Sequence, residues 1–328
     1  MRSTILLLLL SAFTTAHATI HRVNNTGIAA DFTTLQDAHD AANAGDTLHL
    51  EPSGSSYGAC AFTKPLVVIG PGYFLNLNAG LQAATSSAIT GGLVFEAGSE
   101  GAVVSGLDVQ GQSQVKASFV RIERCRFSGN GMDLNIVYNT SGLNITGVVV
   151  NGCHVLNNLI VGSVGSTIND LAISNTRVRQ FNFSTGGATS GEVLNCVAIS
   201  LGTTAVFGAP GVVFRNCILD GAVTPGGSAY EHTLFSGATV PATNGNQINV
   251  NMGTVFVGGS GDAQFALAPG SPAIGAGVGG VDCGIFDGLE PYTLSGIPPV
   301  PSIFTLTAPT STDQGTPLQV TISSRAND

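Results

Sequence analysis

Apolar and polar residues alternate in short runs between about residue 100 and residue 220, and these runs recur at a nearly constant spacing. Aligned on five small anchor residues, which lie 28, 23, 20 and 21 residues apart, every run has an apolar residue three positions before and two positions after its anchor. A two-residue alternation within a period near twenty is typical of short strands that stack as successive coils of a solenoid. The anchors are Cys125, Cys153, Thr176, Cys196 and Cys217; the preceding column is Ile122, Val150, Ile173, Val193 and Phe214, and the following column is Phe127, Val155, Val178, Ala198 and Leu219.

The alternation changes phase just before each anchor, so the chain has to bend there between two strands. Asn175, Asn195 and Asn216 occupy this position in three units, and Gly152 occupies it in another. Asparagine and glycine enter the left-handed backbone region at the least cost, which a sharp bend requires. Coils stacked at the ordinary interstrand spacing of about 4.8 Å bring equivalent residues together, so we expect a hydrogen-bonded asparagine ladder and inward-facing apolar columns.

Proline usage supports this architecture. Residues 72–209 contain no proline, although the chain has 14. Interior strands of a stacked sheet donate their N–H groups to a neighbouring strand, and proline has no such group. A β-sandwich is the alternative fold, but regular units with matching columns favour a parallel solenoid.

Three segments outside the repeats are distinctive: FTTLQDAHDAANAGDTLHLEPSGSSYG (32–58), KPLVVIGPGYFL (64–75) and GSPAIGAGVGGVDCGIFDG (270–288). They are similar, in this order, to the N-terminal cap, the first coil and the closing coil of secreted bacterial proteins in the pectin-lyase-like superfamily. The resemblance implies an all-β, right-handed parallel β-helix. It implies little about activity, because one fold can host lyases, hydrolases, esterases and non-catalytic surface proteins.

One helix is predicted, at the N-terminal end of the coils. Thr33 and Gln36 have the spacing of a capping box, and Gly45 is placed to end the helix. Its apolar face would cover the open end of the first coil, which would otherwise expose a sheet to aggregation. That face consists of Leu35, Ala38 and Ala42.

The two ends of the chain differ from the coils. Residues 1–18 have the pattern of a signal peptide, so we expect cleavage near Ala18 and a secreted protein without membrane insertion. Two alternating runs, Ile303–Thr307 and Leu318–Ile322, predict a β-hairpin that packs on the solenoid, with the start of an abbreviated β-sandwich as the alternative. The expected organisation is a signal peptide (1–18), an N-terminal cap (19–58), a parallel β-helix (59–290) and a proline-rich linker with a strand pair (291–328).

Composition narrows the classes of partner. Only 9% of the residues are charged, and the net charge of −9 comes from scattered carboxylates without a basic patch, so nucleic acid is not an expected partner.

Four of the six cysteines fall in one inward-facing column, where parallel side chains about 4.8 Å apart are poorly placed for disulfides. We expect free buried thiols, with stacked disulfides or a metal site as the alternatives.

The motifs of the superfamily's enzymes are missing from this chain. Lysine, one of the bases used by lyases of acidic polysaccharides, occurs only at Lys64 and Lys116, and the carboxylates form no calcium loop. No histidine lies between glycines as in the hydrolases, and the tryptophan of the esterase motif is absent. No serine nucleophile elbow, phosphate loop or zinc spacing occurs either, so we expect no catalytic residue, no cofactor and no metal.

One outward column combines positive charge with proximity. The position after each anchor holds Arg126, His154 and Arg177 in three successive coils, so these side chains are expected about 5 Å apart on a solvent-facing surface. Like charges in register destabilise a sheet unless an anion answers them, so this column is a candidate site for uronate or sulfate groups of a polysaccharide. The alternative is a solvated face in which carboxylates pair with the arginines, the candidates being Glu123, Asp133 and Asp170.

A second candidate is the unit before Cys153, which is longer than its neighbours, so residues 135–142 are expected to bulge outward as a loop. Loops on rigid scaffolds often carry binding residues. Tyr138 is placed there to stack on a sugar ring beside Asn139. An ordinary surface insertion is the alternative.

These features predict an exported, non-catalytic β-helix protein of a cell surface or matrix, with weak binding of a partner or a polysaccharide, an acidic one being the expected ligand. The enzymatic alternative is a lyase or glycoside hydrolase that acts on an extracellular acidic polysaccharide near Arg126, His154 and Arg177. A structural spacer without a ligand is the third hypothesis. The pattern sets no oligomeric state.

Overall fold

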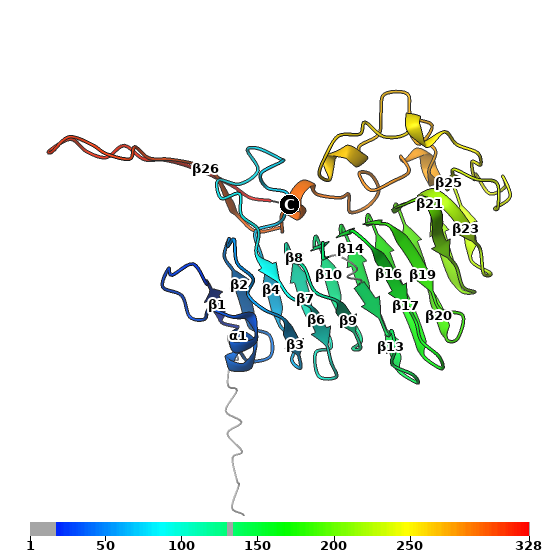
Figure 1. Cartoon of the computed structure of the whole chain (residues 1–328), viewed down its shortest axis with the longest axis horizontal. Helices are drawn as coiled ribbons and strands as arrows, with labels where there is room; N and C mark the ends of the chain where they lie inside the picture. The colour runs from blue at the N-terminus through cyan, green and yellow to red at the C-terminus, as the bar shows by residue number, and fades with distance from the viewer. Residues whose placement is uncertain (1–17, 130–133, 328) are drawn as a thin grey trace, which may run out of the picture.

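A computed structural model describes residues 18–129 and 134–327, and within these ranges most regular elements are β-strands. Parallel strands stack into a β-solenoid of about 8 turns, seen side-on in Figure 1. The predicted all-β, right-handed parallel β-helix with a small C-terminal hairpin is confirmed. The predicted signal peptide falls outside the described residues except for Ala18, and it stays a prediction.

The strands form three parallel ladders, one on each side of the solenoid. The first ladder contains β1 (Ile20–Val23), β2 (Thr47–Leu50), β4 (Val67–Ile69), β7 (Val103–Ser105), β10 (Arg121–Glu123), β14 (Val149–Asn151), β17 (Thr167–Ser174), β20 (Ala188–Leu194), β22 (Val212–Arg215) and β24 (Ala229–Glu231), with β13 (Asn144–Thr146) beside β17. The second contains β5 (Ile89–Thr90), β8 (Asp108–Val109), β11 (Arg126–Phe127), β15 (His154–Val155), β18 (Arg177–Val178), β21 (Val197–Phe207), β23 (Ile218–Thr224) and β25 (Leu234–Phe235).

The third ladder was not predicted, because the sequence pattern indicated only two short strands in each coil. It contains β3 (Cys60–Phe62), β6 (Leu93–Phe95), β9 (Ser113–Val115), β12 (Leu134–Ile136), β16 (Asn158–Val161) and β19 (Gln180–Phe183). It joins the second ladder at β21 and β23, which are long enough to pair in both.

The predicted columns are observed in register. Ile122 lies opposite Val150, Val150 opposite Ile173, and the same column continues to Val193 and Phe214. All five side chains are fully buried. Their burial removes apolar area from water, at roughly 25 cal/mol per Å², in a continuous column that stabilises the stack.

The bends between the first and second ladders have the predicted backbone geometry. Asn175, Asn195 and Asn216 have φ values of 46°, 50° and 55°, and Gly152 has a φ of 61°. The predicted asparagine ladder forms only at one step, where Asn216 Nδ2 donates to Asn195 Oδ1 at 3.3 Å. The other amides point outward and bond a C-terminal segment described below.

All six cysteines are buried and unpaired, so the predicted free thiols are confirmed. Burial raises the pKa of the Cys125 thiol to about 12, and it raises the pKa of Cys153 and Cys217 well above the ordinary value. These thiols therefore act as small apolar groups in the core at neutral pH.

The predicted capping helix is α1 (Leu35–Ala41), which buries Leu35 and Ala38 against the first coils. Its N-cap is Thr34 rather than Thr33, since the Thr34 hydroxyl accepts the backbone N–H of Asp37 at 3.2 Å. Gln36, expected to complete a capping box, instead accepts the backbone N–H of Ala61 at 2.8 Å and so ties α1 to β3.

The C-terminal part of the solenoid differs from the expectation of coils as far as residue 290. Parallel pairing between strands ends at β25, and residues 250–297, called the strap here, run back across the outer side of the second ladder (Figure 1). The strap has no strand and contains four short 3-10 turns, η1 (Met252–Thr254), η2 (Ala263–Phe265), η3 (Val278–Gly280) and η4 (Leu294–Gly296). The segment 270–288, expected to close the helix as a coil, is part of this strap.

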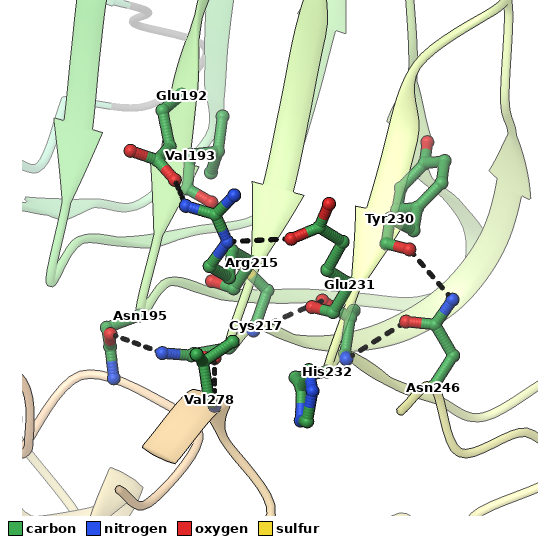
Figure 2. Close-up of polar contacts among 12 residues, drawn as sticks. Glu192, Val193, Asn195, Arg215, Cys217, Tyr230, Glu231, His232, Asn246 and Val278 are labelled. Carbon is green, nitrogen blue, oxygen red and sulfur yellow. Dashed lines mark hydrogen bonds and ion pairs between the residues drawn. The ribbon is translucent and has the colours of Figure 1, made fainter. Parts of the chain in front are cut away.

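The outward asparagine amides hold the strap in place. Asn175 Nδ2 donates to two strap carbonyls, both at 2.8 Å, and Asn195 Nδ2 donates to two more at 3.0 and 3.2 Å. Asn216 Oδ1 accepts the backbone N–H of Val278 at 2.9 Å, a contact drawn in Figure 2. The accepting carbonyls are those of Ile285 and Asp287 for Asn175, and of Asp282 and Gly284 for Asn195.

The C-terminal hairpin pairs β26 (Ser302–Thr307) with β27 (Thr321–Arg325) in antiparallel register. It contacts the solenoid only near its base, where Ala83 N–H donates to the Ile303 carbonyl and Arg325 donates to the Leu81 carbonyl. The rest extends away from the coils (Figure 1), with residues 308–320 exposed. The expected packing on the solenoid is therefore limited to its base.

Candidate functional site

The second ladder brings Arg126, His154 and Arg177 together as the repeat predicted. Arg126 pairs with His154 and His154 with Arg177 on consecutive coils. The prediction that this column faces solvent is wrong, because His154 is only 4% exposed. The rings of Phe74 and Phe265 lie 5.3 and 5.8 Å from its imidazole and cover it from outside.

The cover changes the electrostatics of the column. Burial, together with the charges of Arg177 and Arg126, holds the pKa of His154 well below its ordinary value, so its imidazole is neutral at pH 7. Arg126 Nη1 lies 3.3 Å from the Asp108 carboxylate, and its guanidinium stacks over the Phe74 ring at 4.4 Å. Arg126 therefore already has its counterion and does not need an external anion.

Two of the three carboxylates proposed as partners of this column bond elsewhere. Glu123 pairs with Arg121 at 2.5 Å, and Asp170 accepts the Thr146 hydroxyl at 3.1 Å. Asp133 lies outside the described residues. Arg126 thus pairs with a carboxylate, as the alternative expected, but its partner is Asp108 and not one of the predicted residues.

Arg177 is the member of the column that reaches an open pocket. The pocket has a volume of about 370 Å³ and also receives Arg179 from the same coil. Neither arginine forms an ion pair with any carboxylate in the described part of the chain. The remaining lining is Leu156, Asn157, Ile199, Ser200 and Thr203.

The loop candidates lie beside a larger groove. Tyr138 is half-buried and Asn139 exposed, in the turn that follows β12, and both line a groove of about 570 Å³. The structure does not bring them to the Arg126 column, since they belong to the third ladder. The predicted site is therefore divided between two ladders.

The groove crosses four adjacent strands of the outer face. Ile160 of β16 lies opposite Asn182 of β19, Asn182 opposite Phe207 of β21, and Phe207 opposite Thr224 of β23. Three interstrand steps of about 4.8 Å give the groove a length of about 14 Å along the stack. The turns that follow these strands complete its lining with Gly162, Ser163, Val164, Phe183, Ser184, Thr185, Gly208 and Gly226.

The chemistry of this lining is amphipathic and uncharged. Tyr138 and Phe207 supply aromatic surface, and Phe207 is 38% exposed. Asn139 and Asn182 supply amides that can both donate and accept hydrogen bonds. Polar groups placed around apolar surface in a concave site are the usual composition of a small-molecule or sugar site.

The residues that line the pocket and the groove come close together along the chain, and the two sites together are called the binding face here. Arg179 immediately precedes β19, and Asn182 lies within β19, so a residue of the cationic pocket and a residue of the uncharged groove are three positions apart in the chain. At the rise of a strand this is about 10 Å. One extended ligand is long enough to contact both.

Other charged groups on the first ladder are paired with one another. Arg215 lies between Glu192 and Glu231, as Figure 2 shows, and its Nε is 2.9 Å from Glu231. A cleft between this ladder and the strap, of about 670 Å³, contains the Arg121–Glu123 pair and Glu290. Glu290 accepts the Asn151 amide at 2.7 Å.

Sequence reasoning missed Asn182, Phe207, Ser200 and Thr203. The signal was present, because these residues follow the anchors Thr176 and Cys196 within their coils. The alignment failed there because β21 contains extra residues between Ile199 and Thr204, where its register against β23 shifts.

No protein-family model, no curated protein and no solved structure matches the chain. Across residues 18–129 and 134–327, no group of three or more His, Cys, Asp or Glu side chains is arranged to hold a metal ion. In the same ranges no helix is long and apolar enough to cross a membrane.

Proposed function

We propose that this chain is an exported, non-catalytic β-helix protein that binds a polysaccharide along the groove of its binding face. The observation that carries the proposal is the groove itself, which is about 14 Å long, uncharged and lined by Tyr138, Asn139, Asn182 and Phe207. A linear polymer of sugars matches a groove that crosses four adjacent strands of the stack. Aromatic rings contact the apolar faces of sugars, while amides bond their hydroxyls.

Rigidity supports the same function. The groove lies on strands and the short turns between them, and the buried Phe181 and Phe183 rings support it from the core. A site held by regular strands needs little ordering when it binds, which lowers the entropic cost of association.

The enzymatic alternative near Arg126, His154 and Arg177 has less support. A general base has to come within hydrogen-bond distance of the proton that it removes. Phe74 and Phe265 cover His154, and Asp108 already pairs with Arg126. A substrate would have to displace the Phe74 and Phe265 rings to reach His154.

The test is retention of the mature chain, from Thr19 onward, on immobilised neutral and acidic polysaccharides, with and without calcium. We expect retention on at least one polymer, and we expect Tyr138→Ala and Phe207→Ala each to weaken it about 5- to 10-fold, since an aromatic contact contributes roughly 1 kcal/mol. Phe119→Ala is the matched control, because Phe119 is 56% exposed and does not line the groove.

Reducing ends and unsaturated-uronate absorbance are recorded on the same samples. Product formation would reject the non-catalytic function. Retention that is equal in the wild type and both groove variants would reject the groove as the site.

A further inference from the structure

We infer that the pocket lined by Arg177 and Arg179 binds a single oxyanion, the sulfate, phosphate or carboxylate group of a ligand. This pocket differs from the column that the sequence indicated, because His154 is covered by aromatic rings and neither His154 nor Arg126 lines it. The inference deepens the proposed function and, for the polysaccharide part of its test, rests on it.

The main argument is the state of the Arg177 guanidinium. Its Nε is buried without a hydrogen-bond partner among the described residues, and its Nη1 donates to the Val155 carbonyl at 3.3 Å. The Phe265 ring lies 5.2 Å from it and covers one face, so further bonds have to be made at its edge. A cation that is largely removed from water in this way is costly unless an anion pairs with it.

The surroundings of Arg177 do not supply that anion. Its coil neighbours on the ladder are the neutral His154 and the apolar Val197. Asp220 is the carboxylate that pairs beside pocket residue Ile199 in the next coil, yet it forms no ion pair with either arginine in the described chain. Burial also lowers the pKa of Arg177 to about 10, which agrees with a charge that has no ion-pair partner among the described residues.

Arg179 supplies a second guanidinium to the same pocket. It is exposed, and its Nη2 donates to the Asn158 side chain at 3.1 Å, which leaves further N–H groups available. Two guanidinium forks match the planar or tetrahedral geometry of an oxyanion. The hydroxyls of Ser200 and Thr203 bond each other and nearby carbonyls, so recognition is expected to come from the arginines.

The first experiment titrates the full mature chain with inorganic sulfate and follows thermal unfolding, with sodium chloride at matched ionic strength as the reference. A ligand that binds only the folded state raises the unfolding temperature progressively once its concentration exceeds its dissociation constant. We expect this behaviour in the wild type and an affinity at least about 10-fold weaker in Arg179→Ala, from the loss of one charge-assisted contact.

Arg179→Ala is the principal variant because an exposed side chain without an ion pair is not needed for folding. Arg177→Ala is the second variant, and its circular dichroism spectrum is compared with that of the wild type. Arg121→Ala is the matched control, since Arg121 pairs with Glu123 on the first ladder, and its affinity for sulfate should not change. An unfolding temperature that rises no more in sulfate than in chloride, or an equal rise in Arg179→Ala and the wild type, would overturn the inference.

A second arm identifies the source of the oxyanion with sulfated and unsulfated forms of one polysaccharide. Stronger retention of the sulfated form, lost in Arg179→Ala, would assign the pocket to a group carried by the polymer. Sulfate binding with equal retention of both forms would assign it to the free ion. Sulfate binding without retention of any polysaccharide would reject the proposed function alone, and retention without sulfate binding would reject the oxyanion pocket alone.

Discussion

Asp262 is the buried carboxylate that locks the strap, and its replacement by alanine should destabilise the fold strongly. The residue is fully buried. Its Oδ1 accepts the Asn78 amide at 2.8 Å, and its Oδ2 accepts the Tyr292 hydroxyl at 3.1 Å and the Ser295 backbone N–H at 2.6 Å. The Tyr292 hydroxyl is also 2.7 Å from the Tyr73 hydroxyl, which belongs to the first coils. Asp262 therefore joins two parts of the strap to each other and connects them to the first coils.

The size of this loss of stability follows from the hydrogen-bond donors that Asp262→Ala leaves buried without an acceptor. Each unsatisfied donor costs about 1–3 kcal/mol. Tyr292 can redirect its proton to the Tyr73 hydroxyl, so two donors remain, and we expect a loss of about 2–6 kcal/mol in the free energy of unfolding.

Equilibrium unfolding in urea, followed by circular dichroism, measures this loss. Asp313→Ala is the control, because Asp313 is exposed beyond the end of β26 and should change stability by less than about 0.5 kcal/mol. A change below about 1 kcal/mol in Asp262→Ala would show that the strap is not held in this way.

Three further predictions concern the core, the first ladder and pH. Because burial lowers the pKa of His154, the unfolded chain binds a proton below about pH 6.5 that the folded chain excludes, so the free energy of unfolding should fall by up to about 1.4 kcal/mol per pH unit on acidification. Urea titrations between pH 7 and 5 should show a shallower fall in His154→Gln than in the wild type, and an identical slope would contradict this. Because the pKa values of the Cys153 and Cys217 thiols are raised, a thiol reagent at pH 8 should label neither until urea unfolds the chain, whereas rapid labelling of the folded protein would refute their burial. Arg215→Ala should lower the free energy of unfolding by less than about 1 kcal/mol despite its two carboxylate partners, since all three side chains are about a third exposed and solvent screens their charges. A larger loss in thermal or urea unfolding would mean that the ion pairs are stronger than solvent screening allows.

Local rules of the repeat determined much of the fold in advance. Inward columns such as Ile122, Val150 and Ile173 follow from the period-two alternation of a strand, and that alternation survives in the structure. The bend at Asn175 follows from the low cost of left-handed geometry for asparagine. The helix cap was displaced by one residue, to Thr34, because neighbouring threonines offer similar hydroxyls to the first turn.

The environment of the candidate residues depends on contacts that are distant in sequence, and it could not be predicted in the same way. The repeat placed Arg126, His154 and Arg177 in one column, but the ring that covers His154 and Arg177 is Phe265, which follows the last coil. Nothing in the alternation indicates that a strandless segment folds back over the second ladder. The exposure of the Phe207 ring could not be predicted either, because the bulge in β21 shifts this residue out of register with the repeat.

The most direct test of the central claim is a hydrogen-exchange footprint of the mature chain with and without a polysaccharide that retains it. Binding along the groove predicts slower amide exchange at residues 160–164, 182–185 and 207–208, with no change in β10 and β14 of the first ladder. Protection confined to the cleft between the first ladder and the strap, or exchange that is unchanged throughout the binding face, would contradict the account.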